Sequence, residues 1–184
     1  MGSSYQFCLH PSRTLPILEI TFLDIIRGTD GINVLAVCDH AYWFLWVGVN
    51  ALGGMSDQTN YNMSSISTLV KDLPAGVYVA GDNTFQPTEH MIPPFLGSQK
   101  LNVWNDLFNF HLSQIRMKIE QTFGIFVMLW GIFNRSLRMG LANVSVLILT
   151  AAKLHNFILQ WKYPKADVLP SHHEIICDFG VSNV

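Results

Sequence analysis

The apolar pattern of this chain changes from strand-like to helix-like near its middle, and this change limits the folds available to it. Three short apolar runs precede residue 81, and each ends at a glycine or an aspartate: residues 33–38, 42–47 and 77–80. From residue 104 onward, apolar side chains recur at steps of three, four or seven, which is the spacing of one helix face. Strands followed by helices around one core predict an α/β or α+β domain.

Two further elements are expected before the long helices begin. The first two apolar runs are separated by a few residues, which predicts a hairpin. Residues 64–73 predict a short helix, with Ser64 or Ser65 as its cap and a Pro-Ala-Gly stop after it.

The long helices are expected over residues 104–138 and 141–159, with Gly140 between them. The second is very apolar, but it contains Lys153 and His155. A membrane span needs roughly 20 mostly apolar residues. We therefore expect a buried core helix and no membrane partner.

The composition is unusually poor in charge for a free-standing domain. Hydrophobic residues make up 49% and charged residues 13%, against about a quarter charged in an average soluble domain. Either the chain buries a large share of itself or it is a piece of something bigger. Cys8, Cys38 and Cys177 are odd in number and form no Cys-x-x-Cys pair, which favours a reducing compartment over a disulfide scaffold. No basic segment precedes an apolar stretch, so no secretory signal is expected.

The charges are distributed unevenly along the chain. Residues 1–115 hold four basic and nine acidic side chains, a net −5, whereas residues 116–165 hold seven basic and one acidic, a net +6. The last nineteen residues add −3. Acids in one half and bases in the other suit a metal site beside a phosphate-binding face. Ordinary solvated helix charge is the alternative.

Three acids stand where strands or turns end, at Asp39, Asp57 and Asp82. Carboxylates at strand ends can converge at one edge of a sheet, and Mg²⁺ prefers oxygen ligands of this kind. Each acid also has a structural interpretation. Asp39 and Asp82 could be turn residues, and Asp57 could cap the segment that follows it.

A fourth acid, Glu120, lies in the long helix four residues after Arg116, so the two share a helix face. They are either part of a site or an exposed ion pair. His155 is either a metal ligand or a buried, hydrogen-bonded core residue. The residues taken alone leave the function open. Four tryptophans are expected in the core and not in a base-stacking surface: Trp43, Trp46, Trp104 and Trp130.

The sequence around these acids resembles that of the Harbinger-type transposase nucleases, which are DDE superfamily endonucleases. The resemblance runs from about residue 33 to residue 158. The similar phrases are Asn33-Val-Leu-Ala-Val-Cys-Asp39, Gly53-Gly-Met-Ser-Asp57, Ala80-Gly-Asp-Asn-Thr-Phe85, the pair Pro93-Pro94, the pattern N-x-x-x-S-x-x-R-x-x-x-E-x-x-F-G over residues 109–124, and Leu154-His-Asn156. Each phrase is weak by itself, and their order makes the set specific.

This resemblance implies a ribonuclease-H-like mixed sheet flanked by helices, and DNA cleavage that depends on Mg²⁺ or Mn²⁺ in the nucleus. Carried over by motif, Asp82 would be the second catalytic acid, Glu120 the third, and Asp57 a further metal ligand. Arg116 and Lys118 would contact DNA phosphate or orient Glu120.

One part of the family pattern is missing. The resemblance implies a first catalytic acid on an earlier strand. No segment before Asp39 resembles the motif that carries this acid, and the residues around Asp24 and Asp30 do not match that motif either. We therefore expect an incomplete first strand in an N-terminally truncated or divergent chain, with Asp39 or Asp57 as a substitute acid. The expected parts are a divergent segment 1–31, a nuclease-like domain 32–160 and an irregular tail 161–184.

Two function classes follow, a metal-dependent endonuclease and a non-catalytic remnant that binds DNA or a Myb/SANT-like partner protein. A gene fragment that does not fold alone is a third. Because a site lacking one of three acids holds metal poorly, the sequence predicts weak or absent cleavage. Full Mg²⁺-dependent cutting of DNA by the purified chain would contradict this prediction.

Overall fold

The computed structural model describes residues 17–24, 32–50, 56–135, 137, 139–162 and 176–180, and for residues 17–24 and 176–180 it describes the backbone. The strands are β1 (Ile17–Asp24), β2 (Asn33–Cys38), β3 (Phe44–Asn50), β4 (Tyr78–Ala80), β5 (Met91–Ile92) and β6 (Ile176–Gly180). The helices are α1 (Asp57–Met63), α2 (Ile66–Lys71), α3 (Val103–Leu129) and α4 (Leu141–Lys162), with short 3-10 helices at Gly97–Leu101 and Gly131–Asn134.

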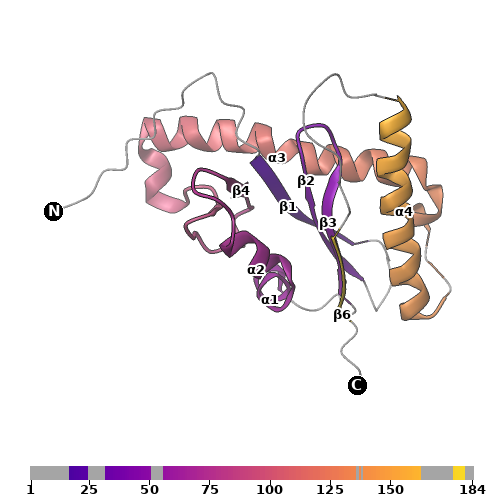
Figure 1. Ribbon diagram of the computed structural model, residues 1–184. Helices are drawn as coiled ribbons and strands as arrows, with labels where there is room; N and C mark the ends of the chain where they lie inside the picture. Colours follow the sequence, from indigo (N-terminus) through magenta and orange to yellow (C-terminus); the bar gives the residue numbers. More distant parts are fainter. Residues whose placement is uncertain are drawn as a thin grey trace.

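The strands form one mixed sheet in the order β5-β4-β1-β2-β3-β6 (Figure 1). β1 is antiparallel to β2, and β2 is antiparallel to β3. The pairs β1–β4, β4–β5 and β3–β6 are parallel. The α/β expectation is confirmed, and so is the hairpin of β2 and β3.

The expectation of an incomplete first strand is wrong. β1 has 8 residues and lies inside the sheet, where it pairs with β2 from Glu19 to Asp24 and with β4 from Ile17 to Glu19. The lack of the acid motif does not imply the lack of the strand. A strand needs only β-forming residues and partners on both sides, and Ile-Leu-Glu-Ile-Thr-Phe-Leu supplies the former.

Both chain ends contribute to this sheet. β1 comes from the segment expected to be divergent, and β6 comes from the tail expected to be irregular, yet each pairs with a strand of the middle part. The predicted domain limits stay predictions, but the sheet crosses two of them.

Helices cover both faces of the sheet. Alternate side chains of β2 enter two separate core clusters, so this strand is buried on both sides. α3 and α4 contribute Ile119 and Ile148 to the cluster on one face. α1 and α2 contribute Tyr61 and Val70 to the cluster on the other. α3 crosses the strands on its face, as Figure 1 shows.

Two sequence expectations about the helices need correction. α3 ends at Leu129 and not near residue 138, because Gly131, a poor helix former, opens a 3-10 helix there. Trp43 and Trp46 are buried as expected, but Trp104 is 76% exposed on the first turn of α3.

α4 is a core helix on one side. Its segment Asn143–Lys162 is long and apolar enough to cross a membrane by length and composition, a test that a core helix also passes. Ile148 and Leu149 are buried against the sheet, whereas Phe157 and Trp161 are exposed. The expectation of a core helix is therefore confirmed for one face.

Asn156 ties α4 to β3. Its Oδ1 accepts a hydrogen bond from the Phe44 N–H at 3.0 Å, and its Nδ2 donates to the Phe44 carbonyl at 2.8 Å. β6 pairs with β3 only from Trp46 onward, so the amide occupies the strand edge just before β6 begins. The side chain thereby satisfies buried backbone groups that no strand among the described residues reaches.

Replacing Asn156 by Leu should destabilise the fold strongly, because it leaves the buried N–H and C=O of Phe44 unpaired. We expect a loss of about 2–4 kcal/mol in the free energy of unfolding, measured by urea titration. Asn143→Leu is the matched control, since Asn143 is exposed on the same helix. It should change stability by about 0.5 kcal/mol or less. Equal losses in both variants would contradict the proposed role of the amide.

Candidate functional site

Asp82 follows β4 after a glycine that the packing requires. A Cβ at Gly81 would lie 2.8 Å from the Met91 sulfur and 2.9 Å from a ring carbon of Phe85. The Gly81 N–H donates to the Ile92 carbonyl at 3.1 Å, so strand pairing continues to Gly81. Asp82 is therefore the first residue beyond the sheet, held at the end of a buried strand.

The Asp82 carboxylate is held in one orientation by its own turn. Its Oδ1 accepts hydrogen bonds from the Thr84 backbone N–H, at 2.8 Å, and from the Thr84 hydroxyl. The side chain is half-buried. The turn interpretation of Asp82 is thus supported, and it does not compete with a site, because a fixed carboxylate is a better ligand than a mobile one.

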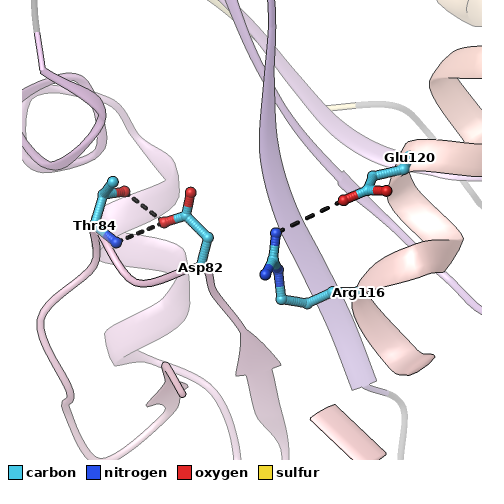
Figure 2. A network of polar contacts seen from close by, with 4 residues as sticks. All are labelled: Asp82, Thr84, Arg116 and Glu120. Atoms are coloured by element: carbon cyan, nitrogen blue, oxygen red, sulfur yellow. Dashed lines mark hydrogen bonds and ion pairs between the residues drawn. The ribbon is translucent and has the colours of Figure 1, made fainter. Parts of the chain in front are cut away.

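Glu120 and Arg116 project from α3 toward the same region. The Arg116 Nη2 lies 3.8 Å from the Glu120 Oε1, and the side chains are 26% and 63% exposed. Figure 2 shows the Arg116 guanidinium between the carboxylates of Asp82 and Glu120. Two separate sets of contacts are drawn there, Asp82 with Thr84 and Arg116 with Glu120, and no hydrogen bond or ion pair among the described residues joins the two sets.

The Arg116–Glu120 contact does not by itself explain the place of Arg116. An exposed pair of this spacing contributes about 0.3–0.5 kcal/mol. The Arg116 Nε is buried and has no hydrogen-bond partner among the residues that the structure describes. A buried donor of this kind calls for an acceptor.

The Asp39 carboxylate accepts hydrogen bonds within the turn between β2 and β3. Its Oδ1 accepts from the Ala41 N–H at 2.8 Å and from the Trp43 N–H at 3.0 Å. Cys38 and Ala80 both lie opposite Glu19, but β2 and β4 run in opposite directions from that level. Asp39 and Asp82 are thus separated by roughly 10 Å across the sheet and roughly 10 Å along it. The structure does not bring them together.

Asp57 is the first residue of α1, and the cap of that helix is Ser56, whose hydroxyl accepts from the Thr59 N–H at 3.3 Å. The first turn of α1 touches the loop after Asp82, because the Gln86 N–H donates to the Gln58 Oε1 at 2.8 Å. Asp57 precedes Gln58 in this first turn, so it lies on the helix that contacts the loop after Asp82.

The donor chemistry fits a small, hard cation in part. Among the side chains described, no three histidine, cysteine, aspartate or glutamate residues are grouped so that they could hold a metal ion. Asp82 and Glu120 offer oxygen ligands from a strand end and a helix on one face of the sheet. Mg²⁺ is commonly bound by one or two carboxylates together with substrate phosphate, so the residue types fit this ion.

A family model described as DDE superfamily endonuclease matches residues 11–156, which is more than half of the chain. The chain belongs to this endonuclease family. No curated protein and no solved structure matches it. The family indicates nuclease or transposase-like function, a DNA substrate and the use of divalent metal ions. The match also begins before β1, earlier than the resemblance from residue 33 had indicated.

Lys118 contacts the turn between β2 and β3. Its Nζ donates to the Tyr42 hydroxyl at 2.9 Å and stands 4.7 Å from the centre of the Tyr42 ring. Residues two apart on a helix do not face each other, so Lys118 and Arg116 point in different directions. The contacts of Lys118 hold the β2–β3 turn against α3.

Asn109, which opens the motif that contains Arg116 and Glu120, has a structural role of its own. Its side chain accepts from the Phe95 N–H at 2.8 Å and donates to the Phe95 carbonyl at 2.9 Å. It therefore fixes the loop after Pro93-Pro94 to α3, two helical turns before Arg116. The signal was in the sequence, because this asparagine opens the phrase that leads to Arg116 and Glu120.

His155 is a buried core residue, as one of its two interpretations stated. It has no exposed surface, and its Nε2 lies 3.0 Å from the Tyr42 carbonyl. That contact makes Nε2 the donor, which leaves Nδ1 as a bare, buried acceptor without a described partner. Burial lowers the pKa of His155, and the hydrogen bond to Tyr42 opposes that shift more weakly.

This lowered pKa makes stability depend on pH. A histidine that is harder to protonate when folded stabilises the fold fully above its unfolded pKa of 6.5, and that contribution is lost as the pH falls below it. We expect urea unfolding to show a smaller free energy at pH 5 than at pH 7.5. His155→Gln should flatten this difference, whereas His111→Gln, an exposed change on α3, should keep it. A difference that survives His155→Gln would contradict the assignment.

Proposed function

We propose that this chain is a metal-dependent DNA endonuclease of the Harbinger type, which hydrolyses phosphodiester bonds with Asp82 and Glu120 as metal-binding acids. One observation carries the proposal. Asp82 is held at the end of β4 by Thr84, and Glu120 pairs with Arg116 on α3, and both acids lie within the segment that matches the endonuclease family.

The proposed fold is ribonuclease-H-like. Its support is the arrangement of three sequential antiparallel strands, β1 to β3, with β4 and β5 added in parallel on the side of β1. A long helix, α3, packs across this sheet and carries the third motif acid. The prediction of weak cleavage is based on the missing acid motif, and it stays a prediction.

The residues of the chain would divide the work in a simple way. A bound Mg²⁺ or Mn²⁺ would supply a polarised water and positive charge at the phosphate. Asp82, fixed by Thr84, and Glu120 would hold the ion. Arg116 would orient Glu120 and offer its guanidinium to a phosphate oxygen, for which its flat, forked shape is suited. Asp57, on the neighbouring helix turn, is the further acid of the proposed site. The endonuclease would act in the nucleus.

A second candidate is a non-catalytic module that binds DNA or a protein partner of the Myb/SANT type. The observation in its favour is a group of large apolar side chains exposed around the start of α3. Such patches commonly mark protein interaction sites. The exposed residues are Leu101, Val103, Trp104, Leu107 and Phe110.

The test is a calorimetric titration of the purified chain with Mg²⁺ and Mn²⁺, followed by cleavage of a supercoiled plasmid. Asp82→Asn with Glu120→Gln should weaken ion binding by about tenfold or more and abolish cutting. The control is Asp72→Asn with Glu89→Gln, which removes the same charge from two exposed positions. It should leave both unchanged.

Two results would count against the endonuclease. Equal ion binding in the wild type and the double variant would mean that the acids do not form a metal site. Retention of a labelled DNA duplex without any cutting, unaffected by either pair of changes, would support the non-catalytic module.

A further inference from the structure

We propose that the outer face of α3 binds α3 of a second copy of this chain, with the two helices running in opposite directions. This inference does not depend on the proposed endonuclease. Its support is the spacing of exposed residues along α3, the apolar area that they expose, and the fit of this face to its own reversed copy.

Exposed residues recur along α3 with the period of a coiled-coil seam. Steps of four and three alternate along the helix from Val103 to Met128, and all eight positions on these steps are exposed. We call these eight positions the outer seam. The buried residues Leu112, Ile119 and Phe126 lie on the opposite side of the helix, toward the sheet.

The outer seam is apolar and carries no charged residue. Charged residues are depleted in the centres of protein interfaces, which this composition matches. Three of its positions are Gln114, Gln121 and Gly124. The other five are Val103, Leu107, Phe110, Met117 and Met128.

The exposed apolar area is large enough for a stable dimer. The five apolar residues of the outer seam and the neighbouring Trp104 are 47% to 85% exposed. Taking roughly 150–250 Å² for a full side chain of this size, they expose roughly 600–900 Å² together. A standard interface covers about 800 Å² on each partner. A second copy that covered this surface would also account for a chain so poor in charge.

The first turns of α3 gain little from the core of their own chain. None of residues 103–111 is buried, and the first buried residue of the helix is Leu112. Short helices without tertiary packing are marginal in water. A partner on the outer seam would supply packing where the sheet does not.

Large and small residues of the outer seam fit a reversed second copy. When two such helices lie antiparallel with their centres aligned, Leu107 of each copy lies opposite Gly124 of the other. A Cβ at Gly124 would meet nothing within 4 Å, so this position is an open hole that a large side chain can fill. A parallel pair would instead place Gly124 opposite Gly124 and Phe110 opposite Phe110, which leaves a gap in one layer and crowds another.

The other layers of the reversed pair are compatible with this arrangement. The pairing is the same from either copy, as an interface with two-fold symmetry requires. The Gln121 Oε1 already accepts a hydrogen bond from the Tyr42 hydroxyl at 3.1 Å, so this oxygen keeps a partner when it is covered. The remaining pairs are Val103 with Met128, Phe110 with Gln121, and Gln114 with Met117.

The first experiment measures the mass of the full chain by sedimentation equilibrium over a range of protein concentrations. We expect a reversible dimer. Met117→Glu should raise the dissociation constant of this dimer by about tenfold or more, because pairing would bury a charge without a partner. Met63→Glu is the matched control, since it adds the same charge at an exposed position of α1. It should leave the dissociation constant within about twofold.

Two results would overturn the pairing. A chain that stays monomeric at every concentration would leave the outer seam to a different protein. Equal dissociation constants for the two variants would mean that the dimer forms through another surface.

The second experiment tests the direction of the pairing by disulfide cross-linking of the variant with both Leu107→Cys and Gly124→Cys. These positions are roughly 25 Å apart on one helix, too far for a disulfide within a copy. We expect a covalent dimer on mild oxidation. Leu107→Cys alone should give only the background of the native cysteines, because its introduced thiols are equally far apart in the reversed pair. Equally fast cross-linking of the single variant would overturn the antiparallel arrangement.

Discussion

The pairing of β1 with two partners is the interaction on which the rest of the structure depends. β2, β3 and β6 lie on one side of it, and β4 and β5 lie on the other. Without β1 these would be two small sheets, each with an exposed edge. Asp82 belongs to one of them, while α3 is packed against β1 and β2. The strand therefore sets how the loop that carries Asp82 and the helix that carries Glu120 lie relative to each other.

α3 serves both the core and the candidate site. Ile119 and Phe123 are buried beneath it, while Arg116 and Glu120 lie on its partly exposed side. Asn109 fixes the same helix to the loop that precedes it. Because the apolar residues position the helix on the sheet, the position of Glu120 relative to Asp82 follows from core packing. A change in the core beneath α3 would therefore be felt at the site.

The turn between β2 and β3 is a second well-anchored part of the structure, and β2 is two strands away from the β4 strand that Asp82 follows. Tyr42 adopts a positive φ of 68°, which is unusual for a residue with a side chain. Its carbonyl contacts His155, and its hydroxyl accepts from Lys118. The Leu154-His-Asn phrase thus has a structural explanation, since His155 holds this turn and Asn156 holds β3.

The sequence by itself determined the local elements and singled out Asp82 and Glu120 as candidate acids. The hairpin, β4 and both long helices follow from apolar periods of two and of three to four, which neighbouring residues encode. The tertiary structure decided which distant segments meet. The central place of β1, the turn around Asp39 and the contact of Lys118 with Tyr42 all depend on pairings between residues far apart in the chain. No local period encodes such a pairing, because it is selected by the burial of the whole sheet between its helices.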